Sequence, residues 1–293
     1  MEVFARVVVA RSFSAAARDL GISQATASKH VQMLESWIGA RLLNRTTRRV
    51  DLTETGENFF AQCTRILEDM EAARQSGMPD ARLRGSLRIS APVAFGSTRL
   101  GALAVEFMQL NDELSLNVIL SDRPVDVIEE GYDLAIRVGH DGTDPARQAG
   151  LVVQSLAPVP FVVCAAPAYL SARGVPETPA DLMNHTCLTD MRHPGDIWRF
   201  NSPRGDVEVP VSGHLKTDNG LLRRGAARAG AGILLAPVFL VEDDLRLGRL
   251  VAILRDHEPP PGTLDTVCPA HRAASPKVRG LISFLTTRLV PTA

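Results

Sequence analysis

The chain has 293 residues, a length typical of two domains, and 45% of them are apolar, which excludes a disordered chain and a small disulfide scaffold. The 32 basic and 33 acidic side chains give a formal net charge of −1, so the chain as a whole carries no electrostatic signature of a nucleic-acid or membrane partner. Residues 1–53 nevertheless hold eight basic and four acidic side chains, a local charge of +4 that leaves −5 for the remainder. We therefore expect any polyanionic partner to meet the N-terminal segment.

Cysteine, hydropathy and motif patterns exclude further classes. The four cysteines lie far apart and form no C-x-x-C pair, which predicts a reduced, cytoplasmic chain without disulfides or structural zinc. No segment approaches the roughly 18–20 apolar residues of a membrane helix, and no signal-peptide layout is present, so we expect no membrane partner. The G-x-S-x-G, P-loop and H-E-x-x-H motifs are absent and the histidines show no metal-ligand spacing, so we expect no catalytic residue, no metal and no cofactor.

The first 40 residues have the pattern of a helix-turn-helix. After a first amphipathic helix, Ser14 is the predicted N-cap of a short Ala-rich helix that Gly21 ends. Ser23 is the predicted N-cap of a second helix, which begins at Gln24 and ends at Gly39. Two helices joined by a three-residue, glycine-containing turn predict a helix-turn-helix.

The exposed face of the second helix carries mostly neutral hydrogen-bonding side chains and one cation: Gln24, Thr26, Ser28, Lys29 and His30. A helix fits the major groove of DNA, where amides, hydroxyls and a lysine can reach base edges or phosphates. The alternative interpretation of this face is an ordinary polar surface.

The next segment favours DNA. It carries Arg41, Arg45, Arg48 and Arg49 without an acidic residue, and two short β-branched stretches near Thr46 and at 50–52 predict a hairpin. The arginines of such a wing can lie along the phosphate backbone. A solvated charge run is the alternative interpretation.

A long helix is predicted to follow, capped by Thr53 and ending at about Arg74. Apolar side chains repeat along it at spacings of 4, 3, 4 and 3 residues: Phe59, Cys63, Ile66, Met70 and Ala73. Such a seam fits a two-helix coiled coil that pairs two DNA-binding heads, and also fits a helix that packs on its own domain.

The segment 12–56, SFSAAARDLGISQATASKHVQMLESWIGARLLNRTTRRVDLTETG, resembles the head of LysR-type transcriptional regulators. Where heads of this family often have Pro and Arg, this chain has Ala25 and Lys29. The resemblance implies a winged helix-turn-helix in residues 1–53, a dimerising linker helix and hinge in 54–84, and an effector domain in 85–293 with the fold of type 2 periplasmic binding proteins. It makes Gln24, Ser28, Lys29, Arg45, Thr46 and Arg48 the leading DNA contacts, with Thr26 and Arg49 beside them.

The remainder of the chain alternates short strands and helices, which predicts an α/β domain with a parallel sheet. A strand at 87–91, a loop at 92–96, a helix that starts at Ser97 or Thr98, a strand at 114–120, a short helix at 125–131 and a strand at 133–138 are expected first. The closing segment should return to this set, giving one lobe of about 85–160 and 268–293 and a second of about 161–267.

We expect function in the cleft between these lobes. Ser97 and Thr98 of one lobe and the Asp218–Asn219 turn of the other are expected at helix starts, which bind small anions, and Arg137 is a candidate counter-charge. The family resemblance adds Thr217. Alternatively, Ser97 and Thr98 only cap their helix and Arg137 only pairs with Asp133 or another acid.

The sequence thus predicts a transcriptional regulator that binds double-stranded DNA under the control of a small effector, such as an organic acid. By resemblance its assembly is a homodimer or homotetramer. One alternative is a cytoplasmic small-molecule-binding protein of the solute-binding fold with little or no DNA-regulatory activity. Another is a structural DNA organiser.

Overall fold

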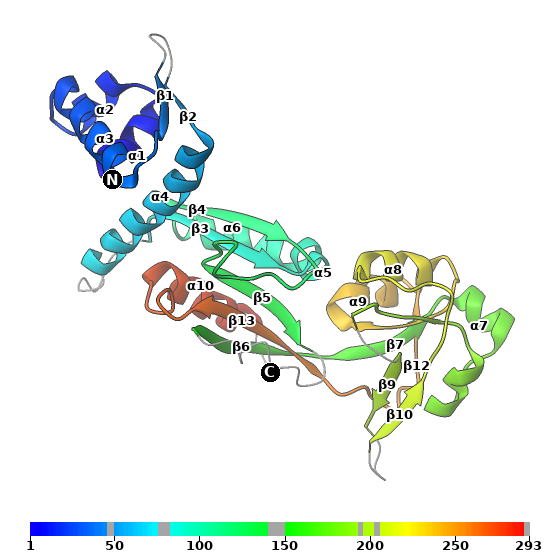
Figure 1. Cartoon of the computed structure of the whole chain (residues 1–293). Coiled ribbons are helices and arrows are strands. Elements are labelled where there is room, and N and C mark those ends of the chain that lie inside the picture. The colour runs from blue at the N-terminus through cyan, green and yellow to red at the C-terminus, as the bar shows by residue number, and fades with distance from the viewer. Residues whose placement is uncertain (46–49, 76–82, 140–149, 193–195, 202–205, 290–293) are drawn as a thin grey trace. The chain divides into compact units, whose positions relative to one another are not determined.

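The computed structural model describes residues 1–45, 50–75, 83–139, 150–192, 196–201 and 206–289. The chain divides into two compact units, Met1–Ala81 and Arg82–Ala293 (Figure 1). The first unit contains both the predicted head and the predicted linker helix. No described helix is both long enough and apolar enough to cross a membrane.

The first unit is a helical head with a two-stranded wing. Its elements are α1 (Glu2–Ala10), α2 (Phe13–Asp19), α3 (Gln24–Ile38), β1 (Leu43–Arg45), β2 (Val50–Leu52) and α4 (Glu54–Gln75). The predicted caps at Ser23 and Thr53 are confirmed, since their hydroxyls accept the amides of Thr26 and Gly56. Gly39 ends α3 with φ of 77°, a left-handed conformation that glycine adopts without strain. The predicted hairpin and its second strand are confirmed, since Asn44 pairs with Asp51 in antiparallel register, but the described first strand is 43–45, and the expected stretch near Thr46 lies outside the described residues.

The predicted cap at Ser14 is wrong. Ser12 is extended, and its hydroxyl accepts the amide of Ala15 at 3.3 Å, so α2 begins at Phe13. Ser14 lies in the first turn, where its hydroxyl contacts that of Ser12. The earlier start lets Phe13 pack, partly buried, on the head core.

The head core fixes the start of α4 and changes the interpretation of its apolar seam. Phe4 of α1 packs on the rings of Phe59 and Phe60, with centroids 5.7 and 6.2 Å apart, and Cys63 is fully buried. Of the two interpretations of the seam, packing on the chain's own domain therefore applies to its first half, at Phe59 and Cys63. Ile66 and Met70, 43% and 65% exposed, continue the seam beyond the core.

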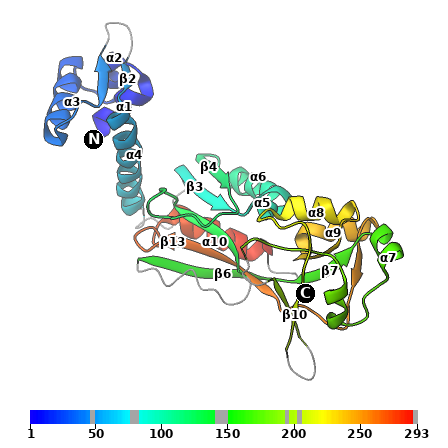
Figure 2. The ribbon, with the colours of Figure 1, turned by 45° about the vertical axis from the view of Figure 1, so that its right-hand side comes forward.

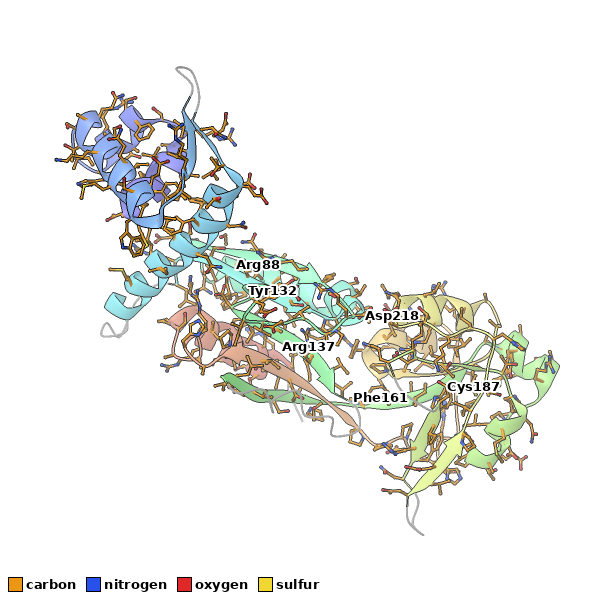
Figure 3. The ribbon with its side chains drawn as sticks, viewed as in Figure 1. Arg88, Tyr132, Arg137, Phe161, Cys187 and Asp218 are labelled. Atoms are coloured by element: carbon orange, nitrogen blue, oxygen red, sulfur yellow. The ribbon has the colours of Figure 1, made fainter. Side chains whose placement is uncertain are left out.

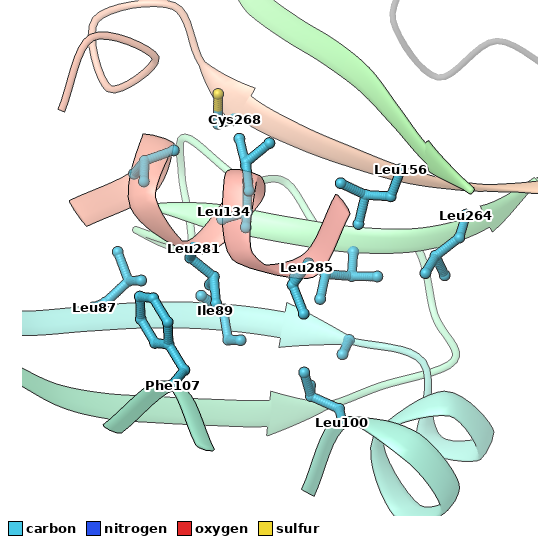
Figure 4. Packing of buried hydrophobic residues seen from close by; sticks show 14 of the residues in the cluster. Leu87, Ile89, Leu100, Phe107, Leu134, Leu156, Leu264, Cys268, Leu281 and Leu285 are labelled. Atoms are coloured by element: carbon cyan, nitrogen blue, oxygen red, sulfur yellow. The ribbon is translucent and has the colours of Figure 1, made fainter. Parts of the chain in front are cut away.

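Within the second unit, the first lobe is a five-stranded sheet in the order β4-β3-β5-β13-β6. Its elements are β3 (Gly85–Ala91), α5 (Val93–Phe95), a π-helical turn (Gly96–Leu100), α6 (Gly101–Gln109), β4 (Leu114–Leu120), β5 (Leu134–Gly139), β6 (Leu151–Val159), β13 (Gly262–Pro269) and α10 (Pro276–Leu289). Leucines of α10 and Phe107 of α6 pack on Leu87 and Ile89 of the sheet (Figure 4).

Several details of this lobe differ from prediction. Only β3, β4 and β5 are parallel, because the returning strand β13 pairs antiparallel with both β5 and β6. The whole of β13 belongs to the first lobe, so the chain returns before Gly262 rather than at residue 268. The expected loop at 92–96 is helical from Val93 onward, and the expected helix at 125–131 is a series of turns.

The second lobe is built on a four-stranded sheet in the order β12-β7-β11-β8, with a separate hairpin β9-β10. Its elements are β7 (Phe161–Ala165), α7 (Pro167–Arg173), a 3-10 helix (Pro179–Asn184), β8 (Cys187–Leu188), β9 (Ile197–Phe200), β10 (Val207–Pro210), α8 (Gly220–Arg228), β11 (Ile233–Pro237), α9 (Val238–Arg246) and β12 (Val251–Ile253). The chain crosses between the lobes twice, at Pro160 and at 254–261 (Figure 2).

Substitution of Gly56 tests the close contact between α4 and the backbone that enters the wing. A Cβ at this position would lie 1.9 Å from the carbonyl oxygen of Leu42. We expect Gly56→Ala to lower the free energy of unfolding of the head by about 1–3 kcal/mol or more, because backbone cannot yield as a side chain can. Denaturant titration followed by circular dichroism measures the change.

The matched control is Gly225→Ala in α8, where a Cβ meets nothing within 4 Å. It should be neutral or stabilising by up to about 1 kcal/mol, as in an open helix interior. Equal stability of the two variants would contradict the close approach at Gly56.

Candidate nucleic-acid interface and interlobe site

The second helix of the helix-turn-helix, α3, presents a polar surface opposite its core contacts. Ala27 and Val31 are buried, whereas Gln24, Lys29 and His30 are exposed and Ser28 is half-buried. Among the described residues, no side-chain hydrogen bond engages Gln24, Ser28 or Lys29. Gln24 and Ser28 stand one helical turn apart, so both can reach the same groove.

Thr26 differs from its neighbours on α3. Its hydroxyl lies 2.8 Å from the Ser23 hydroxyl, and its amide donates to the same oxygen. Thr26 is therefore part of the cap that starts the helix. The sequence pattern placed it only on the polar face expected to contact DNA.

The wing is attached to α3 by Glu35, a residue that the sequence analysis missed. One carboxylate oxygen of Glu35 accepts the amides of Leu42 and Leu43 at 2.9 and 3.2 Å. Thr53 closes the other side, because its hydroxyl donates to the Arg41 carbonyl at 2.7 Å. The polypeptide entering the wing is thus fixed to the helix that bears the polar surface.

The structure describes only part of the predicted wing contacts. The backbone of Arg45 pairs with Val50 at the end of the described hairpin. Thr46, Arg48 and Arg49 lie outside the described residues.

The second candidate site lies between the lobes, where Asp122 joins the starts of two helices. Asp122 follows β4, and its carboxylate accepts the amide of Val93, the first residue of α5, at 3.1 Å. Its other oxygen accepts the side-chain amide of Asn219 in the second lobe at 3.2 Å. Asn219 is the N-cap of α8, since its side-chain oxygen accepts the amide of Leu222 at 3.0 Å. One carboxylate therefore faces the positive ends of two helix dipoles.

A cluster of charges around the buried Asp190 adjoins this contact in the second lobe. Asp190 accepts bonds from the Nε and Nη2 atoms of Arg192 at 3.0 and 2.6 Å and from Nη2 of Arg223 at 2.6 Å. Burial alone would raise the pKa of Asp190, but the Arg192 hydrogen bonds and the charge of Arg223 outweigh it and hold the pKa below its usual value.

The two arginines respond differently to this environment. Hydrogen bonding to Asp190 raises the pKa of Arg192, whereas burial lowers the pKa of Arg223. Both stay charged, because the ordinary arginine pKa lies far above neutrality. Arg192 also donates to the backbone oxygen of Asp122 at 3.4 Å, so the cluster reaches the first lobe.

The structure brings together only some of the predicted effector contacts. Thr217 is buried, and its hydroxyl accepts the Asn219 amide at 3.2 Å. Asp218 is exposed, and its negative charge favours the charged forms of Arg192 and Arg223. Ser97 and Thr98 do not start the helix, which begins at Val93; they are exposed in the π-helical turn, where the Thr98 hydroxyl donates to the Ala94 carbonyl. The sequence analysis placed Ser97 and Thr98 at a helix start under both of its interpretations, as anion ligands and as caps. That placement is wrong.

Arg137 is a half-buried cation on β5 (Figure 3). Its Nη1 atom donates to the Ile136 carbonyl at 3.0 Å, and its Nη2 atom has no hydrogen-bond partner in the described part of the chain. Burial is the main influence on its pKa and lowers it. The alternative pairing with Asp133 is wrong, because that carboxylate contacts Arg272 and the Arg88 amide.

Asp122, Asp190, Arg192 and Arg223 were missed by the sequence analysis. Asp122 carried a signal, since it lies two residues after a strand of the parallel set and ligand crevices lie at the carboxyl ends of such strands. Arg223 stands four residues after the predicted cap Asn219 and so on the same face of α8. Nothing in the local sequence marks Asp190.

A helix-turn-helix with a wing, joined to a two-lobed α/β domain with a polar interlobe site, defines the class of ligand-binding transcription factors. Comparisons agree. The family model for bacterial regulatory helix-turn-helix proteins of the lysR family matches residues 1–57, and the model for the LysR substrate binding domain matches residues 80–290.

Individual relatives and structures are similar over nearly the whole chain. The chain is 32% identical to an HTH-type transcriptional regulator of Xanthomonas campestris pv. campestris (strain 8004), with 98% of this chain and 84% of that protein covered. It is 31% identical to the regulator DmlR of Escherichia coli (strain K12), with 97% and 92% covered. The structure of CrgA, a LysR-type transcriptional regulator from Neisseria meningitidis, matches with a TM-score of 0.63 at 29% identity and covers 98% of this chain and 96% of that one. The chain belongs to the LysR family of transcriptional regulators.

The Asp190 cluster predicts a pH-dependent contribution to stability. Because the pKa of Asp190 is lower in the folded chain, its contribution is complete above the ordinary aspartate pKa of about 4 and is lost as the pH falls through the folded value. Asp190→Asn should lower the free energy of unfolding by about 3 kcal/mol at pH 7. This value is the lower end of the range for breaking a buried ion pair, and it applies because one partner, Arg192, is 42% exposed.

Denaturant titrations of wild type and Asp190→Asn at several pH values measure this difference, which should shrink below about pH 4. Asp243→Asn is the control, since it removes an exposed carboxylate paired with Arg246 and should leave stability nearly unchanged. A pH-independent deficit would contradict the role assigned to the Asp190 charge.

The four cysteines, Cys63, Cys164, Cys187 and Cys268, are buried and free. Burial raises the pKa of Cys164 and of Cys187 to about 12, and the thiolate is the reactive form. We expect the native protein to react negligibly with Ellman's reagent over minutes and to release four equivalents of chromophore after unfolding. Rapid reaction of one thiol in the native protein would contradict the described burial.

Proposed function

We propose that the head binds a two-fold DNA operator, with Gln24, Thr26, Ser28 and Lys29 of α3 in the major groove and Arg45, Thr46, Arg48 and Arg49 of the wing along the phosphate backbone. The observation that carries this proposal is the polar α3 surface, whose side chains at Gln24, Ser28 and Lys29 are free of hydrogen bonds in the described structure, beside a wing that Glu35 fixes to the same helix. Neutral hydrogen bonders suit base edges, and arginines suit phosphates.

We further propose that a small organic acid binds between the lobes and modulates operator binding. Three cations supply the attraction: Arg137, whose Nη2 atom has no partner among the described residues, and Arg192 and Arg223, which share one carboxylate. Thr217, Asp218 and Asn219 would contact the ligand from the second lobe, and Ser97 and Thr98 from the first. Such an effector acts only by the difference between its affinities for two arrangements of the protein.

The proposed assembly is a homodimer, and by family likeness a homotetramer, that acts in the cytoplasm, where an operator is accessible. The exposure of Ile66 and Met70 on α4 supports pairing through the second half of this helix. The alternative of a solute-binding protein without DNA-regulatory activity is not favoured, because residues 1–57 match the lysR helix-turn-helix model.

Two substitutions test the DNA-binding surface. Lys29→Ala should weaken binding about tenfold or more, and Arg45→Ala should weaken it and lower the log–log salt slope by about one unit, as expected when one phosphate contact is lost. Fluorescence polarisation with the DNA upstream of the chain's own gene, at several salt concentrations, measures both.

Arg246→Gln is the control, because it removes an exposed arginine of α9 in the second lobe and should leave DNA binding unchanged. A panel of small organic acids, added to the same titration, tests the effector. Wild-type affinity in both head variants would refute the assigned contacts, and an operator affinity that no acid shifts would refute the proposed effector class.

A further inference from the structure

Asp122 accepts hydrogen bonds from both lobes at once. Its Oδ1 atom takes the first amide of α5 in its own lobe, and its Oδ2 atom takes the Asn219 side-chain amide across the lobe boundary. Its backbone oxygen takes a third bond, from Arg192. Asp122 and Asn219 are each half-buried, so the contact is accessible to solvent and to small molecules.

The residue type at 219 is informative. Asn, Asp, Ser and Thr all serve as N-caps, because each offers an oxygen to the helix amides. Only asparagine also carries a side-chain NH₂ donor. Here the Oδ1 atom of Asn219 caps α8 and the Nδ2 atom binds Asp122, so one side chain both starts a helix and joins the lobes.

Other contacts follow the same side of the lobe boundary. The Phe95 and Phe239 rings meet edge to face with centroids 5.8 Å apart, and Arg99 of the π-helical turn pairs with Glu242 of α9. A Cβ on Gly220 would lie 3.6 Å from that of Ala94, so the starts of α5 and α8 are in close contact. The hydrogen bond between Asp122 and Asn219 is thus the polar part of an apolar and ionic contact.

We propose that Asp122 is a built-in latch, which holds the two lobes together along α5 and α8 when no ligand is bound. The protein's own carboxylate neutralises the two helix starts, so the latched arrangement needs no anion. The latch is of modest strength, because one hydrogen bond to a charged group favours the joined arrangement by only about tenfold to a hundredfold beyond the neighbouring ring and ion-pair contacts. This inference goes beyond the proposed function, since it concerns the ligand-free domain and holds whatever the effector is.

Two variants of Asn219 test the latch without removing the helix cap. Asn219→Ser keeps a capping oxygen and replaces the NH₂ donor that reaches Asp122 with a hydroxyl one bond nearer the backbone, whereas Asn219→Asp keeps the cap, removes every donor and places a second carboxylate against Asp122. Thr178→Ser is the matched control, an N-cap exchange whose hydrogen bonds stay within the second lobe.

The measurement is a distance distribution between spin labels on introduced cysteines at Leu110 and Val175, which are 66% and 59% exposed in the first and second lobe. Labelled full-length chain is mixed with excess unlabelled chain, so that only distances within one chain contribute. The four native cysteines are buried and should not take up label.

We expect one narrow distribution for wild type and for Thr178→Ser, a broader one for Asn219→Ser, and a shift of the main population for Asn219→Asp. Hydrogen exchange at the Val93 amide should stay slow in Asn219→Ser, since Asp122 still accepts it there, which separates an opened latch from a disordered lobe. Distributions for both Asn219 variants that superimpose on wild type would overturn the proposal, as would a Val93 amide that exchanges freely in Asn219→Ser.

Discussion

The return of the chain through β13 is the constraint on which the second unit depends. Because β13 pairs with β5 on one side and β6 on the other, the two crossings between the lobes leave the same sheet from neighbouring strands. Pro160 alone separates β6 from β7, and its carbonyl accepts the Val238 amide that starts α9. The lobes are therefore joined by two adjacent strands and can rotate about them but cannot separate.

Backbone packing at this hinge is tight. A Cβ on Gly262, the first residue of β13, would lie 2.2 Å from the carbonyl oxygen of Gly139 and 3.0 Å from the ring of Phe161. A side chain at this position would have no room, so the close approach depends on glycine. Relative motion of the lobes should thus change contacts far from the hinge, along α5, α8 and α9, where the lobes meet through the Phe95–Phe239 rings, the Arg99–Glu242 pair and the Asp122–Asn219 bond.

In the head, one helix contributes contacts that hold the DNA-binding elements together. The same helix, α3, supplies the buried residues Ala27 and Val31, the exposed polar face and Glu35, which holds the wing. The basic side chains in the described part of the head are thereby carried by a folded surface. This is the physical reason that composition at one end of the chain was informative although the net charge of the whole was not.

Local signals predicted much of the fold, and distant partners account for what they missed. Ser23, Gly39 and Thr53 start or end helices through atoms within a few residues, so the sequence alone identified them. The start of α5 was missed because the carboxylate that caps it, Asp122, lies 29 residues further along the chain. The seam on α4 was real, but a heptad spacing cannot say whether Phe59 and Cys63 face a partner helix or Phe4 of their own head.

The residues of the candidate sites were likewise predictable only where local sequence determines their placement. Exposed hydrogen bonders on α3 follow from helical periodicity, so their placement was predictable from the spacing of Ala27 and Val31. Asp190, Arg192 and Arg223 come together only because β8 and α8 are neighbours in the folded lobe, and their pairing was therefore beyond a reading of the sequence.

The π-helical turn Gly96–Leu100 sets the rotational phase of the helix that runs from Val93 to Gln109. Before the turn, Phe95 meets Phe239 of the second lobe; after it, Phe107 meets Phe284 of α10 in the first. A regular α-helix gains about 100° per residue, so deletion of one residue here would rotate one of these rings away from its partner. A family member with a helix one residue shorter at this point would need its aromatic residues at other positions. The length of this segment, as well as its composition, therefore determines which side chains meet between the lobes.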